Sequence, residues 1–427
     1  MMMLLIILLL ILSYITISNS IVVKYDNTIN TYESNTIVKS FGMASGGIIT
    51  INSNIKSNNN TITLLNNYYV LILIVTQSQM IGWYSYNNND NNGLYNLCNS
   101  PSQVRYTPNI NSINNYTYII NDNDLYNILV LQCYNGNLNN TISISITTSL
   151  VNIIPYNNNV YTQLPIEEVM IPRVVLFEII IYIILCISLI FQLYINKRYV
   201  KQIHILYIIC ILFIIIQLII RYIQIHEIET LGYTKMNMLI LYNIFEHISN
   251  VISLITLLVI SFGLNYGHNV LIREKKIGAI AILCYFIVGF GGAFCTKTTD
   301  QCKSIWLVSY VMRSIVVLGI IVAMNYSVAQ LRAIIINSTW APSTPWHYHK
   351  LQQYQIFRLV FLLYLILPTI FLTIQSTLFT WKDNWIVFLM TELLTLFICI
   401  HVGINFAPDR DDFFNRAFDG TYNARRE

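Results

Sequence analysis

Seven long apolar runs fill the C-terminal part of the chain, from about Val174 to Phe406. Each is close to the roughly 20 residues that a helix needs to cross a hydrocarbon core about 30 Å thick. Only 10% of the residues are charged, whereas a soluble domain carries about 25%. The sequence therefore predicts an all-α bundle of seven transmembrane helices within residues 169–406. The predicted spans are 174–195, 205–222, 236–264, 277–294, 305–328, 356–378 and 385–406.

The chain begins with an apolar stretch from Met1 to Ile17, which is followed by the small polar run Ser18-Asn19-Ser20. This pattern is typical of a secretory signal peptide, so we expect residues 1–20 to be removed. The alternative is an anchor helix that is not cleaved, because no lysine or arginine precedes the apolar stretch. The short apolar core and the small residues after it favour cleavage.

Residues 21–168 are rich in Asn, Ser, Thr and Tyr and poor in charge. Runs rich in Ile, Val, Thr, Tyr and Leu lie between Asn-rich tracts, at 64–76, 116–120, 128–132 and 141–154. Residues 141–147 alternate as a half-buried strand does, and the continuous apolar run 71–75 is typical of a core strand. These features predict an extracellular or lumenal antiparallel β-sandwich domain before the bundle. Residues 407–427 are predicted to form a cytoplasmic tail.

Four cysteines are candidates for disulfide bonds in an oxidising compartment. Cys98 and Cys133 lie in the β-rich region, where the alternative is two free, buried thiols. Cys295 and Cys302 flank a loop that is predicted to lie outside, so a second disulfide is feasible there. Three N-x-[ST] sequons are glycosylation candidates, although some are expected by chance in so Asn-rich a stretch. They are Asn59, Asn115 and Asn139.

Lysine and arginine gather on one side of the predicted bundle, and such an excess marks the cytoplasmic loops. With the N-terminus outside, the outer loops hold only Lys235, Lys297, Lys303 and Lys382, and Arg173 lies just before the first helix. The inner loops and the tail hold Lys197, Arg198, Lys201, Arg273, Lys275, Lys276, Arg332, Lys350, Arg410, Arg416, Arg425 and Arg426. We therefore expect an extracellular or lumenal N-terminus and a cytosolic C-terminus, in a multi-pass protein of the plasma membrane or the Golgi.

Several polar residues fall inside the predicted spans, where a charge at the bilayer centre costs about 2.5–3.5 kcal/mol on insertion scales. Four charged residues stand out: Glu178, Glu246, Arg313 and Glu392. At 1.5 Å per residue they lie roughly 6–15 Å below the predicted outer boundary, in one layer. The same layer contains Gln217, His247 and Asn250.

We expect this layer to form a polar cluster, with Glu246 and Arg313 as its ion pair. The cluster would line a ligand pocket that opens to the outer side. The alternative is structural, because polar side chains also hold transmembrane helices together without binding any ligand.

No motif for catalysis or metal binding is present. The sequence contains no HExxH motif, no G-x-S-x-G elbow, no phosphate-binding loop and no dinucleotide fingerprint. The histidines are scattered, and no Cys–His spacing suits zinc. We therefore expect no enzyme activity, no metal and no cofactor. The expected partners are membrane lipid and an extracellular or lumenal ligand or protein client, not nucleic acid.

Several short motifs carry a family resemblance. They are Lys201-Gln202-Ile203-His204, Glu246-His247-Ile248-Ser249 with the apolar run that follows it, Ile404-Asn405-Phe406, and Phe413-Phe414-Asn415-Arg416. Together with the β-rich domain they resemble the intimal thickness-related receptor family, whose seven-pass part is a rhodopsin-like GPCR transmembrane domain. The resemblance covers the chain from about Pro172 to Phe418.

The resemblance implies an orphan receptor-like protein with a pheromone or ligand response, G protein-coupled signalling and a cytosolic G protein as partner. The Asp-Arg-Tyr and Asn-Pro-x-x-Tyr switches of rhodopsin-type receptors are absent from the third and seventh spans. The alternative function is secretory trafficking or cargo sorting, as in Golgi-dynamics seven-pass proteins of similar layout. A transporter or channel is a third reading, weakened by the largely apolar inner half of the bundle.

Overall fold

The computed structural model describes residues 23–29, 34–57, 68–80, 102, 104–108, 112–134, 142–153, 161–197, 200, 202–262, 272–295, 300–337 and 344–406. By its internal contacts the chain divides into two compact units. The first contains the β-domain, up to Met170, together with Ile225–Thr234. The second contains Ile171–Gln224 and the chain from Lys235 onward. The predicted signal peptide and cytoplasmic tail lie outside the described residues.

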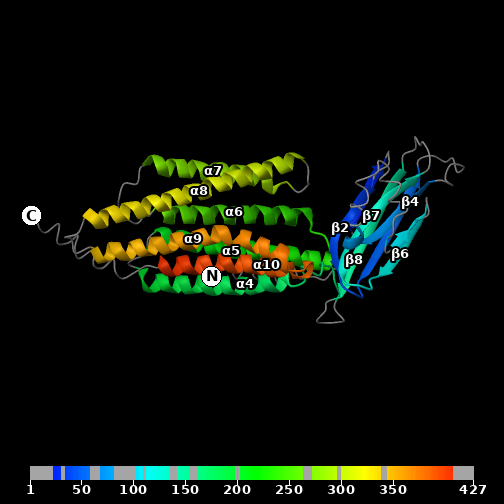
Figure 1. The fold of residues 1–427 in the computed structure, drawn as a ribbon, viewed down its shortest axis with the longest axis horizontal. Helices are drawn as coiled ribbons and strands as arrows, with labels where there is room; N and C mark the ends of the chain where they lie inside the picture. Colours follow the sequence, from blue (N-terminus) through cyan, green and yellow to red (C-terminus); the bar gives the residue numbers. More distant parts are fainter. Residues whose placement is uncertain are drawn as a thin grey trace, which may run out of the picture. The chain divides into compact units, whose positions relative to one another are not determined.

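The β-domain consists of two antiparallel sheets (Figure 1). One sheet has the order β1-β8-β3-β6, with β9 paired to β8, and the other has the order β2-β7-β4-β5. The strands are β1 (Val23–Ile29), β2 (Ser34–Met43), β3 (Ile48–Ser57), β4 (Tyr68–Thr76), β5 (Val104–Tyr106), β6 (Ile113–Ile119), β7 (Asp124–Tyr134), β8 (Ile142–Ile153) and β9 (Tyr161–Thr162). The predicted antiparallel β-region is confirmed, and its four predicted runs correspond to β4, β6, β7 and β8.

One apolar core joins the two sheets, because alternate side chains of each strand point inward. In β8, Ile144, Ile146 and Leu150 are buried, while the odd-numbered residues between them are only half-buried. This alternation agrees with the one predicted for residues 141–147. The run from Leu71 to Val75 in β4 has no exposed surface at all. Its prediction as a core strand is therefore confirmed.

A buried asparagine of β8 holds the turn between β2 and β3. Asn152 is fully buried, and its Oδ1 accepts a hydrogen bond from the N–H of Ala44 at 2.9 Å. Its Nδ2 donates to the carbonyls of Gly42 and Leu164, each at 2.9 Å. Gly46 in this turn has a φ of 86°, which a residue without a Cβ adopts readily. Asn152 thus ties β8 to the turn and to the segment that leads out of the domain.

Tyr126 of β7 gives the β-domain a predictable response to alkaline pH. Its ring is 1% exposed, and its hydroxyl donates to the carbonyl of Asp122 at 3.1 Å. Burial, followed by the nearby Tyr118, Asp124 and Asp122, raises the pKa of Tyr126 from 10.0 to about 12. Because the pKa is raised in the folded state, the stability that this proton contributes is complete below pH 10 and is lost as the pH approaches 12.

We therefore expect Tyr126→Phe to reduce the fall in the unfolding temperature of the β-domain between about pH 10 and pH 12. The measurement is the unfolding temperature of both proteins across this range. An identical fall in the two proteins would contradict a role for the Tyr126 hydroxyl in the alkaline loss of stability.

The modification sites predicted in the β-domain have different positions. Cys98, Asn59 and Asn139 lie outside the described residues, and Cys133 lies in β7. Asn115 lies on the exposed face of β6, where a glycan has room. Glycosylation of Asn115 stays a prediction.

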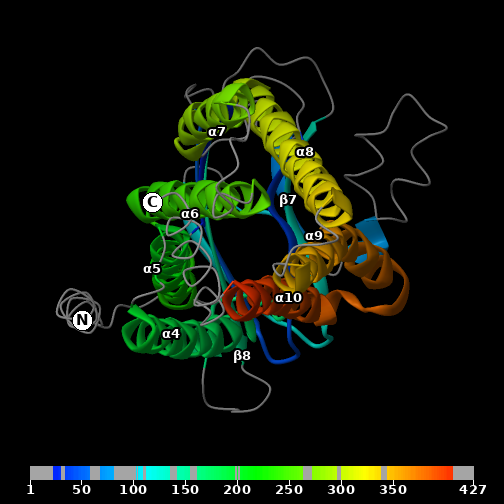
Figure 2. The same cartoon turned by 90° about the vertical axis from the view of Figure 1, so that its left-hand side faces the viewer.

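The second unit is built from seven helices, each long and apolar enough to cross a membrane. They are α4 (Ile171–Ile195), α5 (Gln202–Leu231), α6 (Met236–Ser261), α7 (Ile272–Ala293), α8 (Asp300–Asn337), α9 (Thr344–Leu378) and α10 (Asn384–Asn405), and the short η3 (Trp381–Asp383) precedes α10. In Figure 2 they follow one another around a ring, and α10 returns to the side of α4. The predicted seven-helix bundle is confirmed. We call the end at which α4, α6, α8 and α10 begin the outer end, following the predicted orientation.

Three helices exceed the apolar runs that predicted them by more than ten residues each. The helix α5 continues to Leu231, α8 extends to Asn337, and α9 begins already at Thr344. The added residues include Gln, Glu, Lys and Arg, which are good helix formers but do not belong to an apolar run. Figure 1 shows that α8 and α9 reach beyond the other helices at the inner end of the bundle.

Hydrogen bonds between helices close the inner end of the bundle. The last carbonyls of α6 lack helical partners and need other donors. The hydroxyl of Tyr354 in α9 donates to the carbonyl of Ile260 at 3.1 Å, and Ser327 in α8 donates to that of Ser261 at 2.7 Å. The ring of Phe406 packs edge-on against Tyr354. These contacts bind α6, α8, α9 and the end of α10 to one another.

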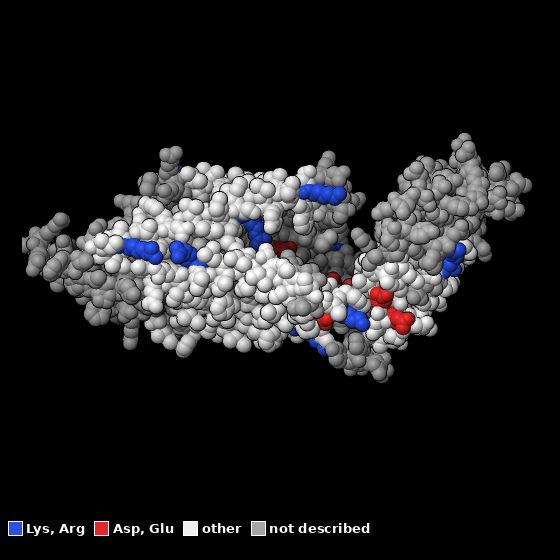
Figure 3. All heavy atoms as spheres, in the orientation of Figure 1, with Lys and Arg blue, Asp and Glu red and all other residues white. Residues whose placement is uncertain are grey.

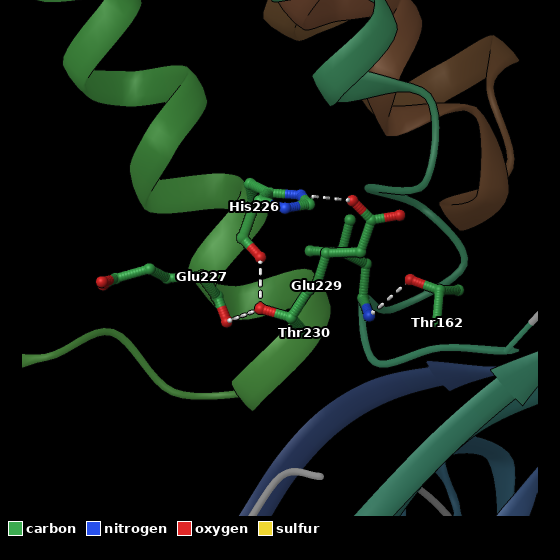
Figure 4. Close-up of polar contacts among 6 residues, drawn as sticks. Thr162, His226, Glu227, Glu229 and Thr230 are labelled. Atoms are coloured by element: carbon green, nitrogen blue, oxygen red, sulfur yellow. Dashed lines mark hydrogen bonds and ion pairs between the residues drawn. The ribbon is translucent and has the colours of Figure 1, made fainter. Parts of the chain in front are cut away.

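The last turns of α5 belong to the first unit and lie beside the segment that follows β9 (Figure 4). There His226 Nδ1 contacts Glu229 Oε2 at 3.4 Å, and the hydroxyl of Thr230 donates to the carbonyl of His226 at 2.8 Å. Gly232, with a φ of 72°, ends the helix, and its N–H donates to the carbonyl of Ile228 at 2.8 Å.

Candidate functional site

Ionisable side chains of the bundle gather in its outer half. They come from five helices: Glu178 of α4, Arg221 of α5, Glu246 of α6, Arg313 of α8 and Glu392 of α10. At 1.5 Å per residue, each lies within roughly 20 Å of the outer end of its helix. Figure 3 shows basic and acidic side chains together in a hollow on the visible face.

The ion pair in this layer joins α5 to α10. Arg221 Nη1 donates to Glu392 Oε1 at 3.1 Å, and each side chain is 23% exposed. The guanidinium of Arg221 also lies over the ring of Phe388, 4.4 Å from its centroid. The sequence predicted Glu246 and Arg313 as the pair, whereas the structure pairs Glu392 with Arg221. Glu246 lies within electrostatic range of both arginines.

Glu178 of α4 depends on the same arginine. It is 1% exposed, and neither of its carboxyl oxygens has a hydrogen-bond partner among the described residues. Its electrostatic neighbours are Glu392 and Arg221. Gln217 lies one turn before Arg221, on the same face of α5. Arg221 is thus the cation that offsets the charge of more than one buried acid.

A cavity of about 230 Å³ lies between α6, α7 and α8. Its α6 lining follows the spacing i, i+3, i+4, i+7, which places these side chains on one helix face. These α6 residues are Asn243, Glu246, His247 and Asn250. The other two helices contribute Tyr285, Gly289, Gly292, Ala293, Trp306, Ser309, Tyr310 and Arg313. The cavity therefore combines an arginine, an acid and amides with aromatic walls.

His247 fits between α6 and α7 because residue 289 has no side chain. The imidazole is buried, its Nε2 lies 3.2 Å from the carbonyl oxygen of Phe286, and its ring packs edge-on against Tyr285. A Cβ on Gly289 would overlap the imidazole ring. The glycine thus fixes how closely α7 approaches the cavity wall.

We expect Gly289→Ala to displace His247 and to lower the stability of the bundle by about 1–3 kcal/mol, as overpacking does. Gly291→Ala is the matched control, because a Cβ there meets nothing within 4 Å. The measurement is the unfolding temperature of the full-length variants in detergent. Adding His247→Ala to Gly289→Ala should restore much of the lost stability. Equal unfolding temperatures for Gly289→Ala and Gly291→Ala would contradict the overlap between a Cβ at residue 289 and the His247 ring.

A disulfide holds the outer rim of this cavity. Cys295 and Cys302, the pair predicted for the loop between the fourth and fifth spans, are joined to each other. Ala293 and Trp306 flank the bridge, and both line the cavity. The amide of Asn243 donates to the carbonyl of Ala293 at 3.3 Å, which links α6 to the same rim.

A second, wholly apolar groove of about 590 Å³ runs between α6 and α7. Its α6 residues, among them Ile252, Ile255 and Val259, form a different face of the helix from the cavity residues. Leu283 and Phe286 of α7 complete the groove. A groove of this kind on membrane-spanning helices fits the acyl chain of a lipid.

The structure divides the predicted polar cluster into two neighbouring groups. Glu246, His247, Asn250 and Arg313 line the cavity. Glu178, Gln217 and Glu392 belong instead to the group around Arg221 on α4, α5 and α10. The site residues that the sequence analysis missed include a basic residue, three aromatic residues and small residues of the cavity wall: Arg221, Tyr285, Trp306, Tyr310, Gly289, Gly292, Ala293 and Ser309. In the described residues, no three His, Cys, Asp or Glu side chains are placed to hold a metal ion.

Comparison with known families identifies the helical part. The family model described as GOST, seven transmembrane domain, matches residues 172–412, which is more than half of the chain. A comparison with curated proteins finds no match. The predicted resemblance to the intimal thickness-related receptor family, with its rhodopsin-like GPCR domain, is therefore wrong. The motifs behind it are only three or four residues long, and the apolar run after Ser249 is of the kind that any seven-helix bundle requires.

Proposed function

Since the chain belongs to the GOST seven-transmembrane family, we propose that it is a non-enzymatic carrier of the secretory pathway. In this proposal it binds an amphipathic ligand, or a lipid-bearing client, in the outer half of the bundle. The observation that carries the proposal is the polar cavity between α6, α7 and α8, set in helices that are otherwise apolar. The ligand's polar group would occupy this cavity.

The size and lining of the cavity favour such a ligand. Its volume of about 230 Å³ is smaller than the 300–1,000 Å³ typical of sites that enclose a drug-sized molecule. It therefore suits a headgroup rather than a whole ligand. Arg313 offers a guanidinium for a phosphate or carboxylate, and Asn243 and Asn250 offer amide donors. The apolar remainder of the ligand would stay among the helices and in the lipid.

Two features favour a carrier over a G protein-coupled receptor. The inner end of the bundle is tied together by Tyr354 and Ser327, and the rhodopsin-type switch motifs are absent. The β-domain adds a second folded element to the same chain, which offers a surface for a protein client. Receptor signalling stays the second candidate, because a ligand that binds between α6 and α8 could alter how these helices contact α9 at the inner end.

The binding experiment uses the full-length protein in detergent with a photoreactive lysophospholipid as probe. We expect crosslinks in α6–α8 and a decrease of about ten-fold or more in labelling for Arg313→Gln, because a charge-assisted hydrogen bond contributes about 1.5–3 kcal/mol. Lys382→Gln, an equal change of charge in η3, is the control and should label normally. Equal labelling of Arg313→Gln and the unaltered protein would refute the cavity as the binding site.

The location of the tagged protein separates the two functions. A carrier is expected to cycle through the Golgi and to move its client with it. Residence at the plasma membrane, together with ligand-dependent nucleotide exchange on a G protein, would overturn the carrier in favour of the receptor.

A further inference from the structure

The helices α8 and α9 mark where the inner membrane surface meets the bundle. They contain 38 and 35 residues, or about 57 and 52 Å, whereas the hydrocarbon core is about 30 Å thick. Trp306, 59% exposed near the start of α8, is placed as interfacial tryptophans are. A helix crosses the hydrocarbon core in about 20 residues, so the inner boundary falls near Asn325 when it is counted from Trp306 in α8. Counted back by about 20 residues from the outer end of α9, the inner boundary falls near Arg358.

Arg358 and Asn325 meet at this level, across the seam between the two helices. Arg358 Nη1 donates to Asn325 Oδ1 at 3.3 Å, and Asn325 is exposed. Because its oxygen accepts from the arginine, the Nδ2 of Asn325 is left to donate outward. Arg332 lies two turns beyond Asn325 on the same exposed face of α8, about 10 Å further from the membrane centre.

Neither arginine forms an ion pair within the part of the chain that the structure describes. The acids Glu392 and Glu229 pair elsewhere, with Arg221 and His226, and no described acid contacts Arg332 or Arg358. Figure 3 shows basic side chains at this end of the visible face, surrounded by uncharged residues. An arginine guanidinium at the boundary of the hydrocarbon core is stabilised when a lipid phosphate pairs with it.

The apolar residues beside the seam face the lipid. Val322 is 61% exposed and Leu359 is 60% exposed. Both lie within one turn of the Arg358–Asn325 contact, on the membrane side of it. Acyl chains can therefore run along the seam while a headgroup lies against the two arginines.

We propose that Arg358, Asn325 and Arg332 form a binding site for a phosphoinositide of the cytosolic leaflet. Arg358 and the amide of Asn325 hold the diester phosphate at the membrane boundary. Arg332 binds a phosphate on the inositol ring, which projects further into the cytosol than the diester phosphate. Basic sites between transmembrane helices on the cytoplasmic side are suited to such headgroups. This site is separate from the outer cavity and stands whether or not that cavity binds a ligand.

The competing explanation is that these arginines only orient the protein, as basic residues of inner loops do. Lys276, exposed at the inner end of α7, provides the matched control because it has the same charge on the same side. If these residues only orient the protein, removing the charge of Lys276 and removing that of Arg358 should change lipid binding equally. A specific site requires Arg358 and Arg332 and leaves Lys276 without influence.

The test uses the full-length protein in phosphatidylcholine nanodiscs that contain phosphatidylinositol bisphosphate or phosphatidylserine, with bound lipid measured by native mass spectrometry. We expect preferential retention of the bisphosphate, lowered about five-fold by Arg358→Gln and by Arg332→Gln, and unaffected by Lys276→Gln. Asn325→Leu tests the seam without changing the charge, and it too should lower retention.

Two results would overturn the proposal. An equal decrease in bisphosphate retention for Lys276→Gln would mean that retention depends only on the total positive charge at the inner side of the bundle. Equal retention of phosphatidylserine and the bisphosphate would contradict the proposed contact between Arg332 and a phosphate of the inositol ring. The unfolding temperature of each variant, measured in phosphatidylcholine alone, shows that lost retention does not come from lost folding.

Discussion

Replacing Arg221 with glutamine is expected to destabilise the bundle by about 3–5 kcal/mol, the cost of removing one partner from a buried ion pair. The substitution leaves Glu392 without its ion-pair partner. Glu178 is buried and has no hydrogen-bond partner within the described part of the chain, and it loses its neighbouring cation at the same time. Glu246 then keeps only Arg313 within electrostatic range. One substitution thus affects three acids in a medium that solvates charge poorly.

The measurement is the unfolding temperature of the full-length protein in detergent, with export from the endoplasmic reticulum as a cellular readout. Arg313→Gln is the matched control, because Arg313 is exposed and forms no ion pair in the described residues. Adding Glu392→Gln to Arg221→Gln should restore part of the loss, since the uncompensated charge disappears. If Arg221→Gln and Arg313→Gln had equal effects, the central role of Arg221 would be refuted.

Arg221 also shows why the sequence revealed only part of the site. The predicted second span ended at Tyr222, which placed Arg221 at the membrane surface, where a basic residue is expected. In the structure α5 continues to Leu231, so that Arg221 lies about 15 Å from the helix end. The polar residues that extend α5 do not contribute to an apolar run. A boundary error of a few turns therefore concealed the cation that pairs with Glu392.

The acids and the cavity wall were easier to predict, because a carboxylate within an apolar run has few explanations and the i, i+4 spacing assigns neighbours to one helix face. Their partners were not predictable. Which helices lie side by side depends on the packing of the bundle, and a run of apolar residues does not specify its neighbours. Glu246 was therefore assigned to Arg313, whereas the ion pair of the layer joins α5 to α10.

The β-domain shows a different limit. Strands with dense apolar runs, such as β4, were predicted, whereas β3 was missed. In β3 the inward positions are Ile49, Ile51, Ser53 and Ile55, all buried. Asn52 and Asn54 lie between them, and asparagine is typical of turns rather than strands. The alternation is present in β3, but a buried serine and outward asparagines hide it.

Replacing Asn152 with leucine is expected to cost the β-domain at least about 2 kcal/mol, and thus a large share of the roughly 5–15 kcal/mol that stabilises a typical domain. The side chain is fully buried and makes three hydrogen bonds to backbone groups, those of Ala44, Gly42 and Leu164. Leucine has a similar volume but removes the partner of the Ala44 N–H and of the Leu164 carbonyl. The carbonyl of Gly42 keeps a hydrogen bond from the N–H of Ile166 at 3.1 Å. Each such buried group costs about 1–3 kcal/mol.

The loss should be concentrated where these hydrogen bonds act. Hydrogen exchange of the full-length protein is expected to accelerate in the turn between β2 and β3 and in the segment around Leu164, the two regions that Asn152 joins to β8. Asn52→Leu, on the exposed face of β3, is the control for replacing an asparagine in this domain. If Asn152→Leu showed the same hydrogen-exchange rates as Asn52→Leu, water would have replaced the lost hydrogen-bond partners. In that case the Asn152 side chain would fill space in the domain without fixing the path of the chain out of it.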